Sequence, residues 1–452
     1  MSKIVIISFW AGEVQASGSN RINSFIKYLD ALGWNVVVLY PDFTSKNLIC
    51  TKKYFFETDA LVDGVKYYRL PGWSLFAWLQ NKIIRKHQGV DDKVGTVNKP
   101  NSRGSVFHFS VRCIKKIILK LGYHLIKGLA FPDDVYWGWF RPNRKKVLNI
   151  IAVENPDIVL TSALPIACHS FGSLMKKRNN IPWVADFRDY YAYGVSPAKL
   201  PGVERLKLAW MRHVVKEATA LITVSKGLAK GLKSQLNQDV HVIYNGYDAA
   251  EIDKAMLCHD PSFLKEKETI YGCYCGRLYP AQYRAFHMFL KWVNDHFDFF
   301  VQHDYRFVIM GPTSQEIQKM VLDFGGHKLV NLFKFLGKKL VEHAFKCQAE
   351  SCALLHFDYD QDGNLSGKVF EYFYFQKPIV VFSRNDESEL CQLLREQGHF
   401  VVMKEGGSDP VMKYIKNFSA DFGKRASAHY FSRSSQADKL SVILQRTLGT
   451  KV

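Results

Sequence analysis

The sequence predicts an α/β fold made of two Rossmann-like, doubly wound domains that face a central cleft. Apolar runs of strand length alternate with amphipathic helical stretches over most of the chain. The 452 residues exceed what one hydrophobic core usually supports. The strand-first rhythm also restarts after a charged, Pro-containing run, 260–268, so we place the boundary within 248–268. The expected domains are 1–250 and 265–425, with a final helix within 426–452 that crosses back to the first domain.

The first domain opens with a buried strand over 3–9, a loop rich in Gly and Ser, and a helix over 22–32. The loop lacks the Gly-x-Gly-x-x-Gly spacing of dinucleotide-binding proteins, and the chain contains no Walker A sequence. Gly12 and Gly18 would let the backbone approach a ligand, and Arg21 either reaches a phosphate or pins the loop.

Residues 73–130 are expected to form a basic amphipathic insertion. Within 106–129, aromatic and aliphatic residues share helical stretches with Lys115, Lys116 and Lys120. Basic amphipathic helices suit the interface of an anionic bilayer, and a core-packed helix with a solvated basic face is the other reading. Lipid contact here would account for the net charge of +19 without nucleic acid.

From residue 156 onward the alternation of strands and helices returns. The expected strands are 156–162, 183–186, 220–224, 269–275, 306–310 and 332–336, and a helix is expected over 203–217. The segment 241–248 is expected to contain a turn at Asn245-Gly246.

The clearest βαβ unit covers residues 352–382. An apolar strand leads into a polar loop, a helix that begins near Ser366 and stops before Pro378, and a second strand. The loop presents backbone N–H groups at a helix N-terminus, which suits a phosphate. Glu371, further along this helix, either turns back to accept hydrogen bonds from ligand hydroxyls or is a solvated residue.

The composition limits the partners. With 61 basic and 42 acidic residues, the chain suits a polyanion: nucleic acid, an anionic membrane or a phosphorylated substrate. Nine cysteines follow no zinc or disulfide spacing, and Cys273 and Cys275 are interpreted as core residues, which favours a reduced, cytosolic chain. No signal-peptide pattern or spanning apolar run is present, so we expect peripheral contact with the inner face of the plasma membrane.

A set of short segments runs in order along almost the whole chain: Gly18–Arg21, Phe131–Asp133, Thr161–Pro165, Ala185–Asp189, Thr223–Ser225, Ile243–Asp248, Gly276–Pro280, Phe335–Gly337 and Ser366–Tyr372. Each is weak alone, but the ordered set resembles the GT-B-fold retaining glycosyltransferases of the large family four (glycosyl transferases group 1). The resemblance implies transfer of a sugar from a UDP- or GDP-linked donor, held mainly by the second domain, to an acceptor held mainly by the first. It also implies retention of the anomeric configuration.

The resemblance assigns roles to charged residues of the second domain. Arg277 matches the arginine that neutralises the leaving diphosphate. The lysine that usually follows is replaced by Gln282, with Arg284 nearby as a substitute. Glu371 matches the glutamate that binds the nucleotide ribose. Family members carry another acid eight positions earlier, where this chain departs from the pattern with Gly363.

Because that acid is missing, the same resemblance implies that backbone N–H groups of the loop contact the donor instead. The N–H groups of Asn364, Leu365 and Ser366 would face the sugar or the diphosphate, and Lys368 would add positive charge.

In the first domain, many relatives place a histidine near the reacting centre, and Arg188 occupies that position here. Asp186 or Asp189 would orient the acceptor hydroxyl or accept its proton, while Arg188 would stabilise phosphate or hold these carboxylates. An Asp–Arg pair that only locks the strand end is the alternative. His169 is a further candidate, although a lone helical histidine is more often structural.

Two metal-like patterns are declined. The run Asp358-x-Asp360-x-Asp362 resembles the start of an EF-hand loop and the Asp-x-Asp motif of another glycosyltransferase fold. The twelfth position is Val369, and a strand precedes the run where an EF-hand has a helix. We therefore expect no essential metal and no cofactor beyond the donor substrate.

The expected function is a glycosyltransferase of envelope polysaccharide or glycolipid biosynthesis, such as lipopolysaccharide or capsule, with a lipid-linked or glycan acceptor. A nucleotide-sugar epimerase on the same fold and a degenerate, non-catalytic partner protein are the alternatives. Nucleic-acid binding is not expected, because the basic residues form no recognisable module.

Overall fold

The computed structural model describes residues 1–12, 17–42, 62–73, 135–189, 203–257, 269–359, 365–397, 400–404 and 428–449. Almost all of the predicted basic insertion, and the loop residue Asn364, lie outside these ranges. The chain divides into two compact units. Unit 1 comprises Met1–Val224, Leu228–Ile243 and Ala437–Val452, and unit 2 comprises Ser225–Gly227 and Tyr244–Gln436.

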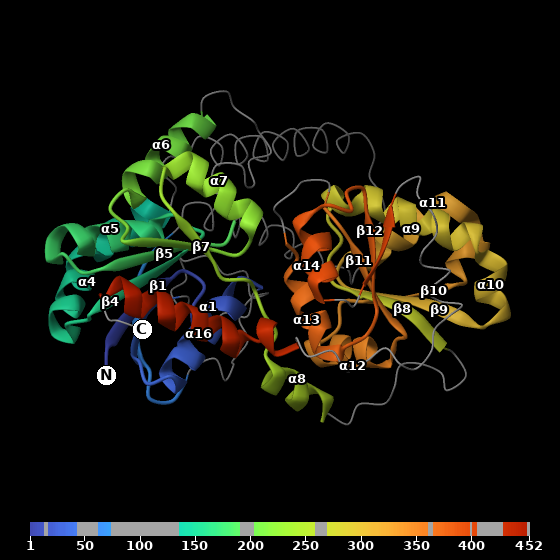
Figure 1. Ribbon diagram of the computed structural model, residues 1–452, viewed down its shortest axis with the longest axis horizontal. Helices are drawn as coiled ribbons and strands as arrows, with labels where there is room; N and C mark the ends of the chain where they lie inside the picture. Colours follow the sequence, from blue (N-terminus) through green and yellow to red (C-terminus); the bar gives the residue numbers. More distant parts are fainter. Residues whose placement is uncertain are drawn as a thin grey trace, which may run out of the picture. The chain divides into compact units, whose positions relative to one another are not determined.

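Unit 1 is built on a 7-stranded sheet in the order β3-β2-β1-β4-β5-β6-β7, with every neighbouring pair parallel (Figure 1). Its strands are β1 (Lys3–Ser8), β2 (Asn35–Pro41), β3 (Lys66–Leu70), β4 (Ile158–Ala163), β5 (Trp183–Phe187), β6 (Ala220–Thr223) and β7 (Val240–Val242). Its helices are α1 (Ser17–Ala31), a π-helical turn (Tyr136–Phe140), α4 (Arg141–Glu154), α5 (Ala167–Asn179), α6 (Val203–Val215) and most of α7 (Lys226–Leu236).

Unit 2 contains a second parallel sheet of six strands in the order β10-β9-β8-β11-β12-β13. Its strands are β8 (Thr269–Cys275), β9 (Tyr305–Met310), β10 (Phe333–Gly337), β11 (Ala353–Phe357), β12 (Ile379–Ser383) and β13 (Phe400–Lys404). Its helices are α8 (Ala249–Met256), a 3-10 turn (Pro280–Gln282), α9 (Tyr283–Asp295), α10 (Phe297–Gln302), α11 (Ser314–Val330), α12 (Val341–Glu350), α13 (Gly367–Phe375), α14 (Glu389–Gln397) and a second 3-10 turn (Ala428–Phe431).

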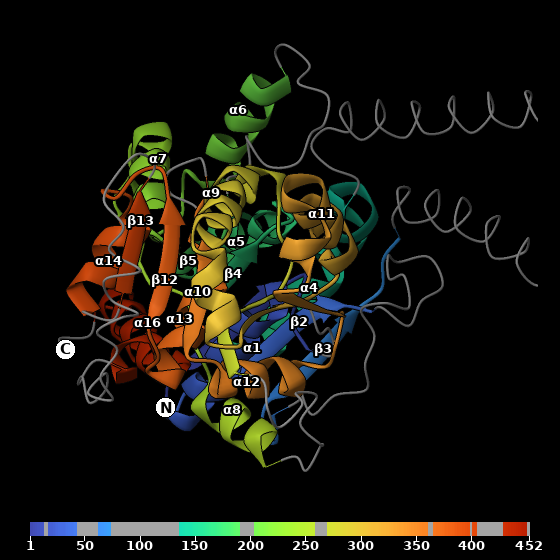
Figure 2. The same cartoon turned by 90° about the vertical axis from the view of Figure 1, so that its right-hand side faces the viewer.

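Each sheet is buried by helices on both faces, which explains the continuous apolar strands in the sequence. In unit 2, α9 packs on β11 and β12, whereas α12 packs on β8. Figure 2 shows β12 and β13 side by side with α14 against β13. The two doubly wound units and their parallel sheets confirm the predicted α/β fold class.

The βαβ unit predicted over 352–382 is present as β11, α13 and β12. Ser366 is the N-cap of α13, and the helix ends where Gln376 adopts a left-handed conformation, with φ of 50°. Within 241–248, strand β7 ends at Val242, ahead of the turn expected at Asn245-Gly246. Ile243 still donates to the Thr223 carbonyl, at 2.8 Å, and the polar turn that follows carries no further ladder bonds to β6.

The last helix, α16 (Arg433–Thr447), crosses the boundary between the units. Ala437, Leu440 and Leu444 belong to the core of unit 1, and Trp34 Nε1 donates to Ser441 Oγ at 2.9 Å. Among the described residues, no helix combines the length and apolarity required to span a bilayer.

Candidate active site

The site residues of unit 2 gather where β8 and β11 lie side by side at the centre of the sheet. The chain order reverses at this pair, and such switch points are where open parallel sheets bind ligands. The backbone is tightly packed here. A Cβ on Gly311 would lie 2.1 Å from the Gly276 carbonyl oxygen, and one on Gly276 would lie 2.1 Å from the Lys368 Cε and Nζ atoms. Both residues have positive φ, 145° for Gly276 and 151° for Gly311, so both positions require glycine.

A short hydrogen-bonded chain fixes the backbone that follows β8. Lys368 Nζ donates to Tyr274 Oη at 2.9 Å, and Tyr274 Oη donates to the Arg277 carbonyl at 2.8 Å. Lys368 Nζ also lies 3.3 Å from that carbonyl. Burial lowers the pKa of Lys368 to about 8, against the opposing charge of Glu371. The Arg277 side chain is exposed. The structure therefore places the Lys368 ammonium against the backbone of Arg277, the other predicted cation.

The N-terminus of α13 enters the same region. Ser366 makes no side-chain cap hydrogen bond, so its hydroxyl satisfies none of the first helical N–H groups. Lys368 and Glu371 lie three residues apart and share a helix face. Leu365 directly precedes the cap and is half-buried. Phosphate oxygens are the ligands that such a combination of N–H groups and a cation favours.

The Glu371 carboxylate is half-buried and has no hydrogen bond among the described residues. Burial raises the pKa of Glu371 to about 6, although the charge of Arg433 opposes this and Glu251 adds to it. Arg433 is itself bonded to Glu251 at 2.8 Å and to the Gly246 carbonyl at 3.0 Å. A half-buried carboxylate that makes no hydrogen bond to the described residues suits a ligand with hydroxyl groups.

Gln282 is placed differently from the expectation that it contacts the donor. Its side chain is 1% exposed, Nε2 donates to the Phe357 carbonyl at 2.6 Å, and Oε1 accepts from the Tyr279 N–H at 3.1 Å. Both polar atoms are engaged within the fold, so Gln282 positions the loop after β8. Arg284, at the start of α9, is exposed and is the cation that can act in its place.

Asp358 is likewise engaged within unit 2. Its Oδ2 accepts from Ser383 Oγ at 2.8 Å and Ser388 Oγ at 3.0 Å, and its Oδ1 accepts from the Tyr359 N–H at 2.9 Å. This carboxylate therefore holds together the segments that follow β11 and β12.

In unit 1, the predicted residues Arg21 and Asp186 form a buried ion pair. Arg21 Nη2 lies 3.0 Å from Asp186 Oδ1, and their side chains are 4% and 0% exposed. Ser162 Oγ donates to Asp186 Oδ2 at 2.8 Å, and Arg21 Nη1 donates to the Ile243 carbonyl at 2.8 Å. Arg21 also lies over the Phe25 ring, with its Cζ 4.7 Å from the centroid. Arg21 thus pins the fold, and Asp186 acts on it rather than on a solvent-side hydroxyl.

Gly12 turns the chain after β1, with φ of 77°. Its N–H donates to Asn23 Oδ1 at 3.0 Å, and Asn23 Nδ2 donates back to the Gly12 carbonyl at 3.1 Å. Gly18 lies in the first turn of α1. These contacts fasten the turn to α1.

Arg188 and Asp189 leave the carboxyl end of β5. Arg188 is half-buried and Asp189 is exposed. Burial lowers the pKa of Arg188, while the charges of Asp186 and Asp189 oppose the shift and Arg21 adds to it. Of the three residues predicted to act on the acceptor, Asp189 is the carboxylate open to solvent.

His169 belongs to a buried network rather than to an exposed site. Trp183 Nε1 and His169 Nδ1 both lie 2.7 Å from Thr161 Oγ1. Trp183 is only a donor, so the Thr161 hydroxyl oxygen accepts from it, and the same hydroxyl is hydrogen-bonded to His169 Nδ1. Burial lowers the pKa of His169 to about 3, which keeps the imidazole neutral.

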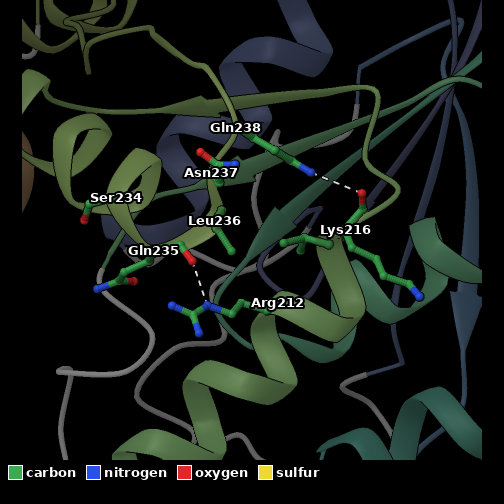
Figure 3. A pocket seen from close by; sticks show the side chains of 8 residues that line it. Arg212, Lys216, Ser234, Gln235, Leu236, Asn237 and Gln238 are labelled. Carbon is green, nitrogen blue, oxygen red and sulfur yellow. Dashed lines mark hydrogen bonds between the residues drawn. The ribbon is translucent and has the colours of Figure 1, made fainter.

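A surface pocket of about 360 Å³ lies at the carboxyl ends of α6 and α7 (Figure 3). Arg212 donates to the Gln235 carbonyl at 2.7 Å, and Gln238 donates to the Lys216 carbonyl at 3.1 Å. No predicted site residue lines this pocket. The carboxyl ends of helices disfavour anions, so it is a poor candidate for a phosphate site.

Comparison with known proteins links unit 1 to a sequence family. Residues 106–251 match the model of Glycosyltransferase Family 4. A search of curated proteins finds no match to the chain.

Solved structures share the fold over the full length. A glycosyltransferase from Rickettsia africae ESF-5 has 13% identity and a TM-score of 0.57, with 100% of this chain and 99% of that chain covered. A sucrose-phosphate synthase from Thermosynechococcus elongatus has 11% identity and a TM-score of 0.57, with 99% and 100% covered. A UDP-forming trehalose-phosphate synthase from Burkholderia xenovorans has 11% identity and a TM-score of 0.58, with both chains fully covered at 100%. The fold is therefore that of the GT-B glycosyltransferases.

We predict that Asp186→Asn destabilises unit 1 by about 3–5 kcal/mol, because it leaves the Arg21 guanidinium buried beside a neutral amide. Urea unfolding measures this free energy. The matched control is Asp239→Asn. The Asp239 side chain is 85% exposed and that of its partner Lys233 is 66% exposed, so this change should leave the stability nearly unchanged. Equal losses in the two variants would contradict the buried ion pair.

We also predict that Glu371→Gln raises the free energy of unfolding above pH 6. The folded-state pKa of about 6 exceeds the ordinary value of 4.5, so wild-type stability is fully present below pH 4.5 and falls as the pH rises to 6. The gain from Gln is therefore absent at pH 4 and reaches about 1–2 kcal/mol at pH 8. Urea unfolding at both pH values measures it, with the exposed Glu350→Gln as control. A constant difference between the two pH values would count against a desolvated Glu371.

Proposed function

We propose that this chain, a GT-B glycosyltransferase of the family-four type as the family match and the fold support, transfers a sugar from a nucleoside diphosphate sugar to a lipid-linked or glycan acceptor. Its place would be envelope polysaccharide or glycolipid biosynthesis, including lipopolysaccharide or capsule. UDP-sugars are the first donors to test, since one structural relative is UDP-forming, and GDP-sugars are the second.

One observation carries the proposal: two cations, an uncapped helix N-terminus and a ligand-ready carboxylate lie at the switch point of unit 2. Arg277 and Lys368 would neutralise the diphosphate, and the first N–H groups of α13 would add to the positive field. Glu371 would accept hydrogen bonds from the two ribose hydroxyls. These parts together match a nucleoside diphosphate better than any one of them does.

The proposed reaction breaks the bond between the anomeric carbon and the β-phosphate oxygen. The acceptor oxygen bonds to that carbon, its proton leaves to a base, and the nucleoside diphosphate leaves with the bonding electrons. Negative charge grows on the leaving oxygen, so fixed cations stabilise the transition state more than the ground state. Retention of the anomeric configuration is part of the proposal and rests on the resemblance to the family. No divalent metal or other cofactor is required in this scheme, because protein cations perform the neutralisation.

On the acceptor side, Asp189 is proposed as the group that orients the acceptor hydroxyl or takes its proton. It is the exposed carboxylate at the end of β5, whereas Asp186 is paired with Arg21. Arg188 would hold the Asp189 carboxylate or an acceptor phosphate.

Peripheral attachment to the inner face of the plasma membrane is proposed from the sequence. The basic segment 106–129, which includes Lys115, Lys116 and Lys120, lies entirely in the 74–134 gap between described ranges. A lipid-linked acceptor would then be delivered at the surface to which the enzyme binds.

We predict that Arg277→Ala lowers kcat/KM for sugar transfer by about 100-fold or more, because it removes a cation from the leaving diphosphate. The assay mixes UDP- and GDP-sugars with envelope lipid extract and measures nucleotide release together with labelled glycolipid. Lys319→Ala, an exposed lysine of α11, is the control and should transfer at the wild-type rate.

The outcomes of this assay separate the alternatives. Conversion of the free donor sugar in the absence of an acceptor would indicate an epimerase instead of a glycosyltransferase. A folded protein that binds a nucleotide but turns over no donor would indicate the non-catalytic partner, and the absence of any donor binding would overturn the enzyme assignment.

We predict that replacing Lys115, Lys116 and Lys120 by Gln lowers the fraction bound to anionic vesicles at least tenfold, since each lysine near an anionic surface contributes about 1 kcal/mol. Vesicle flotation measures the bound fraction. The matched control replaces three exposed lysines of unit 2, Lys319, Lys338 and Lys339, by Gln, so that both triple variants have the same net charge. Equal losses would show that total charge rather than this segment drives binding.

A further inference from the structure

Three cysteines of unit 2 converge on one buried point. Cys273 and Cys275 are alternate residues of β8, so both side chains project from the same face of the sheet. Helix α12 packs on that strand and supplies Cys347. The three Sγ atoms all lie within 4.8 Å of one another, and the residues are 0%, 7% and 0% exposed. This is the one group of three or more metal-ligating side chains found among the described residues.

The three sulfurs are free thiols that lie close enough together to share one ion. An ion with bonds of about 2.3 Å to three sulfurs holds them about 4.0 Å apart. The observed limit of 4.8 Å is close to this value, so small side-chain rotations close the site. Thiolates are soft ligands that select thiophilic d10 ions such as Zn(II) and Cu(I) over the hard ions Mg(II) and Ca(II).

Polar groups around the sulfurs suit the negative charge of a metal–thiolate centre. Ser351 Oγ lies 3.1 Å from Cys273 Sγ and can donate to it. Lys377 Nζ donates to the Ser351 carbonyl at 2.7 Å, which places a cation beside the same turn. Hydrogen bonds from surrounding groups to ligand atoms are the usual support of such sites.

We propose that Cys273, Cys275 and Cys347 form a thiolate site for one closed-shell thiophilic ion, Zn(II) or Cu(I). Each thiol gives its proton to solvent as the sulfur–metal bond forms. The ion would join β8 to α12 directly before Gly276 and Arg277, and so would brace the backbone at the end of β8. The site stands apart from sugar transfer, and its chemistry does not depend on the proposed function.

The test uses the full-length protein, prepared without oxygen and loaded separately with Zn(II), Cu(I) and the probe ion Cd(II). We expect about one ion per chain by elemental analysis, and a rise in Tm of roughly 5 °C or more that a chelator reverses. With Cd(II) we also expect a sulfur-to-metal charge-transfer absorption band. Zn(II) and Cu(I) loading compared at equal concentration shows which ion the site prefers.

The variants separate this site from ordinary buried thiols. The triple change Cys273→Ser, Cys275→Ser and Cys347→Ser should abolish retention of the ion. Cys391→Ser is the matched control, because it makes the same change at a buried cysteine of α14 and should retain the ion.

Several results would overturn the proposal. One is a wild-type protein that retains none of the three ions; another is a triple variant that retains as much as the wild type. Since the triple variant can fail to fold, cadmium NMR of the wild-type protein gives an independent reading. A resonance in the range of oxygen and nitrogen ligands, instead of sulfur, would also exclude the site.

Discussion

The close approach of backbone at the carboxyl ends of β8 and β9 is the constraint on which the site of unit 2 depends. The Gly276 N–H donates to the Met310 carbonyl at 2.6 Å, and the Gly311 N–H donates to the Gly337 carbonyl at 2.7 Å. No side chain fits between these segments, so the space above Gly276 is filled by Lys368 from α13. The lysine charge is therefore placed by sheet geometry, and the helix that carries it also carries Glu371. The close packing at Gly276 thus also fixes the position of the Lys368 ammonium, which is proposed to contact the donor.

The protein uses its buried charges in two different ways. In unit 1 the Arg21 guanidinium and the Asp186 carboxylate satisfy each other, and the pair is fully enclosed. In unit 2 the hydrogen-bonding capacity of Lys368 and Glu371 remains partly unused. Burial lowers the pKa of Lys368 and raises the pKa of Glu371, so it favours the neutral form of each side chain. Unsatisfied buried charge costs stability, and proteins keep it mainly where a ligand supplies the missing partner. The contrast supports the proposal that unit 2 binds the donor, whereas Arg21 and Asp186 are paired with each other inside unit 1.

The sequence predicted what local pattern determines. Apolar periodicity located β11, α13 and β12, and the Ser366 cap and Pro378 stop set the helix between them. Partnerships between distant residues were not predictable in the same way. Arg21 and Asp186 are 165 residues apart, and Cys347 joins Cys275 only because α12 folds back on β8. Gln282 was interpreted from its alignment with a lysine, but an amide that fits two backbone groups is drawn into the interior.

The helix α16 has a consequence for how the chain is made. Ala437, Leu440 and Leu444 complete the core of unit 1, yet they leave the ribosome after all of unit 2. During synthesis part of the apolar core of unit 1 therefore stays uncovered until the last helix is made, while unit 2 can complete its own core earlier. A fragment that ends at Ile243 would carry the same defect permanently. Unit 1 is thus one compact unit assembled from three stretches of the chain, and the last of them is separated from the others by nearly all of unit 2.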